Sequence, residues 1–206
     1  MERFHTIFFV AGIGCFAIAF VLSMIFPWMT LGDYHGMEYQ TLEELAAEPA
    51  PAFHELAASY PEAFAEHYGE VTPESYARAL QRGRDLYVGQ ACWHCHSQYI
   101  RVVSNEEQRF GPPSTAQEYQ NALNQPHLWG TRRVGPDLTR QGGLHTNDWH
   151  VAHMIDPKSV VPASVMPSYA FWFEEDGTPK ESGFAIVTYL QWLGTASRPE
   201  EVADAR

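Results

Sequence analysis

The sequence predicts an all-α protein in which one N-terminal membrane-spanning helix precedes a small helical domain. Three observations support this fold class. Residues 7–28 contain no charged side chain. Apolar residues recur at helical spacing in residues 72–87 and again in residues 182–193. No stretch alternates between apolar and polar residues as a half-buried strand does.

The first 31 residues are predicted to be an uncleaved membrane anchor. As a helix, residues 7–28 span roughly 33 Å, enough to cross the hydrocarbon core of a bilayer. A cleaved signal peptide has a shorter apolar core and a small-x-small cleavage site, and no such site follows here. Arg3 precedes the span, and the next Lys or Arg is Arg78. The positive-inside rule therefore puts the N-terminus in the cytoplasm and the rest of the chain outside.

Residues 32–72 are acidic and are predicted to be a linker or insertion made of short helices. Nine Glu and no Lys or Arg lie between residues 38 and 74. Thr41 and Glu44 have the spacing of a capping box. The charge favours a solvated spacer over a docking surface. The formal net charge of the whole chain, −12, argues against nucleic acid as a partner.

Residues 73–196 are predicted to form the domain, and residues 197–206 a tail. Thr72 and Pro73 have the residue types of a helix start, and Gly194 is placed to stop the last helix. We expect Gly83 of the first helix to cross the last helix near Tyr189 or Trp192, because glycine permits close approach. The intervening residues 99–170 should be mostly loop with short helices.

Residues 92–96 read Cys-Trp-His-Cys-His, the C-x-x-C-H pattern of covalent haem attachment. Cys92 and Cys95 are spaced to bond the two vinyl groups of one haem c, and His96 then lies under the iron. A thioredoxin-like motif would need a βαβ context, and a structural zinc site would need a second ligand pair at a defined spacing. Neither is present in the sequence. His94, between the cysteines, is expected on the surface.

Met166 is the favoured sixth ligand, because flanking prolines stiffen its loop and seventy residues separate it from His96. His150 and His153 are the alternatives. Met154 is expected to pack in the core. His/Met ligation closes both axial positions and suits electron transfer.

Three further residues are candidates for holding the cofactor. A carbonyl in the turn at Pro136 is placed to accept the second ring N–H of His96. Arg132 and Arg133 are candidates for neutralising the haem propionates, with ordinary surface positions as the alternative.

An ordered series of short motifs resembles one known family. The series is Gly83-Arg84-Asp85-Leu86-Tyr87, Cys92 to Arg101, His127-Leu128-Trp129-Gly130, Gly135-Pro136-Asp137-Leu138, Asp148-Trp149-His150, and Val161-Pro162 through Met166-Pro167-Ser168-Tyr169. It is similar to the mono-haem cytochrome c subunit (CcoO or FixO) of cbb₃-type cytochrome c oxidases. The resemblance covers the anchor and residues 83–193.

The resemblance implies a class-I-type cytochrome c domain on the periplasmic side of a bacterial inner membrane. It implies thioether bonds at Cys92 and Cys95, axial ligands His96 and Met166, and the carbonyl turn at Pro136. The implied role is electron relay to the haem b of a catalytic haem–copper subunit. A further cytochrome c subunit or a soluble cytochrome c donor, and membrane lipid, are the other implied partners. The chain itself has no copper ligands or oxygen site and is not the catalyst.

Two features depart from the family pattern. The acidic stretch resembles an insertion, and Val102-Val103 stand where the family usually has proline. The alternative functions are the cytochrome c subunit of a haem–copper nitric oxide reductase, a free-standing anchored carrier, and a gas-binding haem protein.

Overall fold

The computed structural model describes residues 2–30 and 37–195, which form two units. Residues up to Glu38 form the first unit, and the chain from Tyr39 onward forms the second. The predicted tail, residues 197–206, lies outside the described residues.

The first unit contains a helix, Arg3–Thr30, that is long and apolar enough to cross a membrane. It consists of α1 (Glu2–Phe20), a π-helical turn (Val21–Ile25) and α2 (Phe26–Thr30). The wide turn directly precedes Pro27, which has no N–H to donate to a helical carbonyl. The predicted all-α fold with a single N-terminal apolar helix is confirmed.

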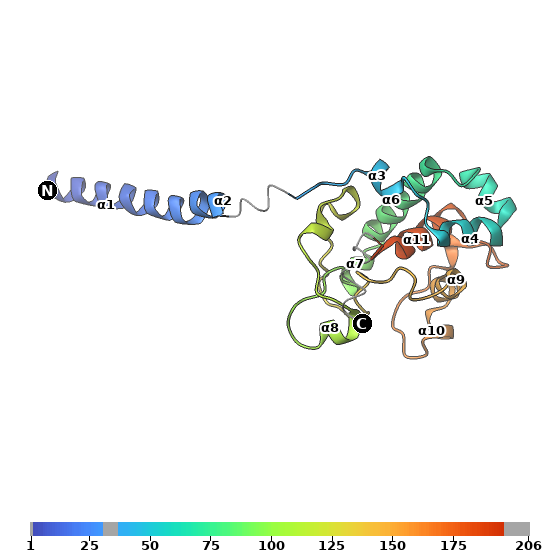
Figure 1. The fold of residues 1–206 in the computed structure, drawn as a ribbon. Helices are drawn as coiled ribbons and strands as arrows, with labels where there is room; N and C mark the ends of the chain where they lie inside the picture. Colours follow the sequence, from blue (N-terminus) through green and yellow to red (C-terminus); the bar gives the residue numbers. More distant parts are fainter. Residues whose placement is uncertain (1, 31–36, 196–206) are drawn as a thin grey trace. The chain divides into compact units, whose positions relative to one another are not determined.

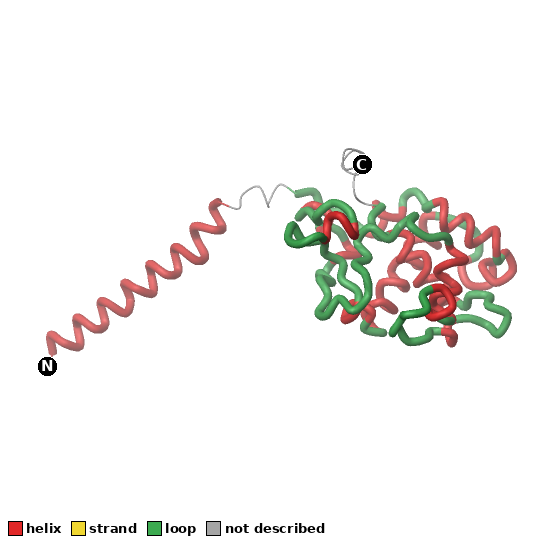
Figure 2. Tube along the Cα trace, turned by 90° about the horizontal axis from the view of Figure 1, so that it is seen from below, coloured by secondary structure: helices red, strands yellow, loops and turns green. Residues whose placement is uncertain are grey.

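The regular secondary structure in the described residues of the second unit is helical, and two isolated β-bridges are the only extended pairing there. Figures 1 and 2 show its helices and the long loops that join them. In chain order the helices are α3 (Leu42–Ala46), α4 (Pro51–Ser59), α5 (Pro61–Tyr68), α6 (Pro73–Gly89), α7 (Cys92–Cys95), α8 (Glu106–Phe110), the 3₁₀ turns Gln117–Tyr119 and Ala122–Asn124, α9 (Asn147–Ile155), α10 (Pro157–Val160), the 3₁₀ turn Ala170–Trp172, and α11 (Glu181–Trp192).

Helices α6 and α11 cross at the centre of this unit (Figure 1). Gly83 makes the crossing possible, because a Cβ at this position would collide with the Ala185 carbonyl and the Tyr189 side chain. The predicted contact between Gly83 and the last helix is therefore confirmed. The predicted start of α6 is confirmed as well, since Thr72 accepts the backbone N–H of Ser75 at 3.2 Å. Just after the C-terminal end of α11, Gly194 has a φ of +91°. This left-handed conformation agrees with the prediction that Gly194 ends the last helix.

The boundary between linker and domain differs from the sequence-based one. Residues from Tyr39 belong to the same compact unit as the rest of the domain, whereas the sequence analysis began the domain at residue 73. Phe53 of α4 and Phe64 of α5 are buried, and their rings lie 5.0 and 5.6 Å from those of Tyr76 and Phe184, respectively. Aromatic burial is favourable enough to fix these short helices on α6 and α11.

Candidate haem site

The C-x-x-C-H motif forms a single helical turn, α7, directly after α6. Ala91 precedes it in the left-handed conformation, with φ 57°, and so separates the two helices. The Cys92 thiol is partly buried and the Cys95 thiol is exposed, and neither forms a disulfide. Burial raises the pKa of Cys92 to about 11. His94 is exposed, as predicted, and its Nδ1 lies 2.9 Å from the Thr131 hydroxyl.

His96 leaves α7 in an extended conformation and is held from two sides. Its Nδ1 lies 2.9 Å from the Pro136 carbonyl oxygen, the contact that the sequence predicted. The Tyr87 hydroxyl of α6 donates to the His96 carbonyl at 3.1 Å. Within the described residues, Nε2 makes no hydrogen bond. One ring nitrogen is therefore anchored and the other is free for a ligand.

The surroundings of His96 favour the neutral imidazole that binds metals. Burial lowers its pKa, and the Pro136 carbonyl and the Asp137 carboxylate only partly oppose this. Gly135 lies against the ring, where a Cβ would overlap all three nearest ring atoms. An anchored neutral histidine, packed on Gly135 and preceded by two thiols, fits a covalently attached haem.

The loop at residues 132–138 runs alongside the motif and is joined to it by a series of backbone hydrogen bonds. Gly135 donates to the Cys95 carbonyl at 2.9 Å, and Leu138 donates to the Ser97 carbonyl at 2.8 Å. The backbone N–H of Arg132 donates to the His94 carbonyl at 3.1 Å. These hydrogen bonds fix Pro136 opposite His96, although the two residues are forty positions apart.

The chain around Met166 returns to the motif. Met166 is partly buried and packs against the same apolar core as Cys92. Three residues later, the side chain of the buried Tyr169 interacts electrostatically with the Cys92 thiol. Its backbone N–H donates to the Met154 carbonyl at 2.8 Å, and Met154 itself is in the core. Tyr169 therefore links this loop both to the core and to the motif; the motif series contains Tyr169, but no role for it was predicted from the sequence.

The two histidines considered as alternative ligands differ in position. His150 is 2% exposed, and burial lowers its pKa to about 3. His153 is partly buried, and its ring interacts electrostatically with that of His96. The structure therefore brings His153, more than His150, toward the site.

Arg132 is exposed, whereas Arg133 is engaged in a protein network. The Arg133 guanidinium donates to the Glu106 carboxylate and to the Tyr99 carbonyl. Glu106 is 5% exposed and also pairs with Arg101. Hydrogen bonding to the Arg101 guanidinium, with a smaller contribution from Arg133, lowers the pKa of Glu106 to about 2. The propionate role of either arginine stays a prediction.

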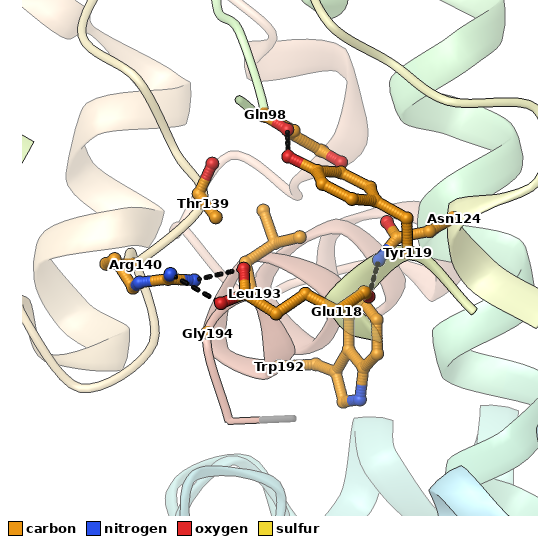
Figure 3. Close-up of a pocket in the computed structure, with 9 residues that line it drawn as sticks. All are labelled: Gln98, Glu118, Tyr119, Asn124, Thr139, Arg140, Trp192, Leu193 and Gly194. Atoms are coloured by element: carbon orange, nitrogen blue, oxygen red, sulfur yellow. Dashed lines mark hydrogen bonds and ion pairs between the residues drawn. The ribbon is translucent and has the colours of Figure 1, made fainter. Parts of the chain in front are cut away.

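A small cavity of about 30 Å³ is lined by Gln98, by the C-terminal end of α11 and by the Glu118–Arg140 ion pair (Figure 3). Arg140 donates to the two Glu118 oxygens at 2.7 and 2.9 Å. The Tyr119 hydroxyl donates to the Gln98 carbonyl at 2.8 Å. This volume holds about one water molecule, so the cavity is a packing feature and does not bind a cofactor.

Comparison with known families identifies the chain. Residues 60–182, more than half of the sequence, match the family described as "Cytochrome C oxidase, mono-heme subunit/FixO". The chain belongs to the FixO family. No curated protein is similar enough to this chain to count as a match.

Membership in the FixO family agrees with the geometry of the candidate haem site. A FixO protein is the mono-haem subunit of a cytochrome c oxidase, so this chain has one haem and a catalytic oxidase subunit as its partner. The N-terminal apolar helix is consistent with a membrane anchor. The fold predicted from the motif series, a cytochrome c domain after one apolar helix, is confirmed.

Proposed function

We propose that this FixO protein binds one haem c through thioether bonds at Cys92 and Cys95, with His96 and Met166 as axial ligands. The observation that carries the proposal is the His96 ring, whose Nδ1 is tied to Pro136 while Nε2 is free. The two thiols of α7 come shortly before that ring in the sequence, and Tyr169, three residues after Met166, interacts with Cys92. Thioether ligation by Met166 favours the reduced iron.

The proposed role is electron relay to the haem b of the catalytic subunit in aerobic respiration. Bound haem supplies a one-electron redox centre. The residues of this chain fix its position: His96 is held through its carbonyl and its ring, and the loop around Met166 is stiffened by prolines. A rigid site keeps the reorganisation that accompanies electron transfer small. The apolar helix at residues 3–30 keeps the domain beside its membrane partner.

We further propose that the N-terminus is cytoplasmic and that the haem domain faces the periplasm. Arg3 lies before the span, whereas residues 37–77 carry acidic charge and no Lys or Arg. Haem is attached to c-type proteins on that side of the membrane. Labelling of cysteines introduced one at a time, with an impermeant reagent in intact spheroplasts, tests this: a site at Ser59 should react, and one at Phe4, which leaves Arg3 in place, should not.

Covalent attachment is tested by acid–acetone extraction of the purified full-length chain. The pigment should stay with the denatured polypeptide in the wild type, and transfer of all colour to the solvent would exclude thioether bonds. Cys92→Ala and Cys95→Ala should each leave mostly apoprotein. Cys15→Ala, which removes the thiol of the apolar helix, is the matched control and should retain full pigment.

The relay is tested in the complex that copurifies with the tagged chain. That complex should consume O₂; consumption of NO without O₂ would place the chain in a nitric oxide reductase. Met166→His keeps six-coordination but lowers the haem potential, so stopped-flow reduction of haem b should slow. Reduction as fast as in the wild type, despite a lowered potential, would contradict the relay.

A further inference from the structure

The buried carboxylate of Asp137 lies directly behind the proposed haem ligand. Asp137 is 7% exposed and follows Pro136, the residue whose carbonyl contacts His96. Its Oδ2 accepts the Ser97 hydroxyl at 2.5 Å and the Tyr99 backbone N–H at 2.9 Å. Its Oδ1 accepts the Thr139 backbone N–H at 2.8 Å. All three partners are donors, and both oxygens act only as acceptors, as an ionised carboxylate does.

No cation neutralises this carboxylate within the described part of the chain. The other buried carboxylate of this region, Glu106, is paired with both Arg101 and Arg133. Hydrogen bonds alone hold the charge of Asp137, and three such donors are sufficient for a buried carboxylate. Its field is therefore not cancelled locally, and the His96 imidazole lies within its reach.

We propose that Asp137 is a positioning residue that tunes the redox potential of the haem: it aims the Pro136 carbonyl at His96 and places an uncompensated negative charge behind that ligand. The inference rests on the proposed ligation by His96. A negative charge on the ligand side stabilises the oxidised iron, which carries one more positive charge than the reduced iron. A carbonyl held firmly against Nδ1–H also makes His96 a stronger donor to the metal. Both effects lower the potential.

The test uses two substitutions that each weaken the hydrogen-bond network around residue 137 but change its charge differently. Asp137→Asn removes the charge and should raise the midpoint potential of the full-length holoprotein. At a fixed solution potential, the ratio of reduced to oxidised haem should increase by on the order of tenfold. This factor corresponds to the low end of the effect that one nearby charge has on the ionisation equilibrium of a neighbouring group. Ser97→Ala keeps the charge, removes one donor that disperses it, and should lower the potential.

The opposite signs separate tuning from a merely structural role. If the carboxylate only clamps the loop, both substitutions weaken the same network, and their potentials should move in the same direction or not at all. Either result would overturn the inference. If Asp137→Asn accumulates no holoprotein, Ser97→Ala decides alone: a lowered potential supports the inference, and an unchanged or raised one refutes it.

The exposed Asp156 supplies the matched control, because Asp156→Asn removes a solvent-screened carboxylate and should leave the potential unchanged. Spectroelectrochemistry of the wild type guards the underlying proposal. A wild-type spectrum without low-spin, six-coordinate haem would mean that the ligand assignment has failed, whereas a normal spectrum with shifts of the wrong sign would mean that only the role of Asp137 has failed.

Discussion

Replacing Gly83 with alanine should destabilise the domain, although alanine is the better helix former. The new Cβ would lie 2.5 Å from Tyr189 Cβ and 2.9 Å from the Ala185 carbonyl carbon, and closer still to the Ala185 oxygen. Most of these atoms belong to the backbone of α11, so the two helices must move apart. Overpacking of this kind costs about 3 kcal/mol at its upper end, and the gain in helix propensity is about 1 kcal/mol. We therefore expect a net loss of about 2 kcal/mol in the free energy of unfolding.

The assay is thermal unfolding followed by circular dichroism, in which this loss should lower the midpoint by roughly 4–8 °C for a domain of this size. Gly89→Ala is the control: Gly89 ends the same helix, and no atom lies within 4 Å of its added Cβ. That variant should be as stable as the wild type or slightly more stable. If Gly83→Ala unfolds at the wild-type temperature or above it, the close crossing of α6 and α11 is not as described.

Three other predictions concern the aromatic core, a buried ion pair and the proposed sixth haem ligand. Phe184→Ala should cost about 3–5 kcal/mol in unfolding free energy and make residues 39–72 more sensitive to protease; unchanged proteolysis would mean that these helices do not depend on the core. Because the pKa of Glu106 is lowered to about 2, its contribution to stability is complete above its ordinary pKa of 4.5 and is lost as the pH falls toward 2. Denaturant midpoints should therefore fall over that range in the wild type and much less in Glu106→Gln, and parallel pH profiles would contradict this. Met166→Ala should abolish the near-infrared sulfur-to-iron band of the oxidised protein, whereas Met154→Ala should keep it; the reverse pattern would exchange the two roles.

Local and short-range features of this fold could be predicted from the sequence. The capping box at Thr41 and the helix start at Thr72 depend only on residues within a few positions, and both are present. The crossing at Gly83 was predictable because a glycine in the middle of an apolar helical face has few other uses. The contact between His96 and Pro136 spans forty residues, but the order of the motifs indicated it.

The packing of α4 and α5 could not be predicted in this way. Their buried aromatics are scattered among exposed glutamates, and Pro51 and Pro61 start two short helices, so neither helix shows a long apolar face. Their partners, Tyr76 and Phe184, lie in helices that the sequence already paired with each other. The ion pair between Arg133 and Glu106 could not be predicted either, because nothing in the sequence around Glu106 indicates that the loops bring the two side chains together.

The packing of α4 and α5 accounts for the charge of the acidic stretch without a binding partner. All nine glutamates between residues 38 and 74 are exposed, and the aromatic side chains of the same helices face inward. The charged residues are thus the solvated side of helices that cover the start of α6. At its other end, α6 leads into Cys92, and its Tyr87 hydroxyl holds the His96 carbonyl. Because one rigid helix joins the aromatic cluster to the haem motif, contacts made by the acidic segment stabilise the element that positions His96, at a distance from the site and without touching the cofactor.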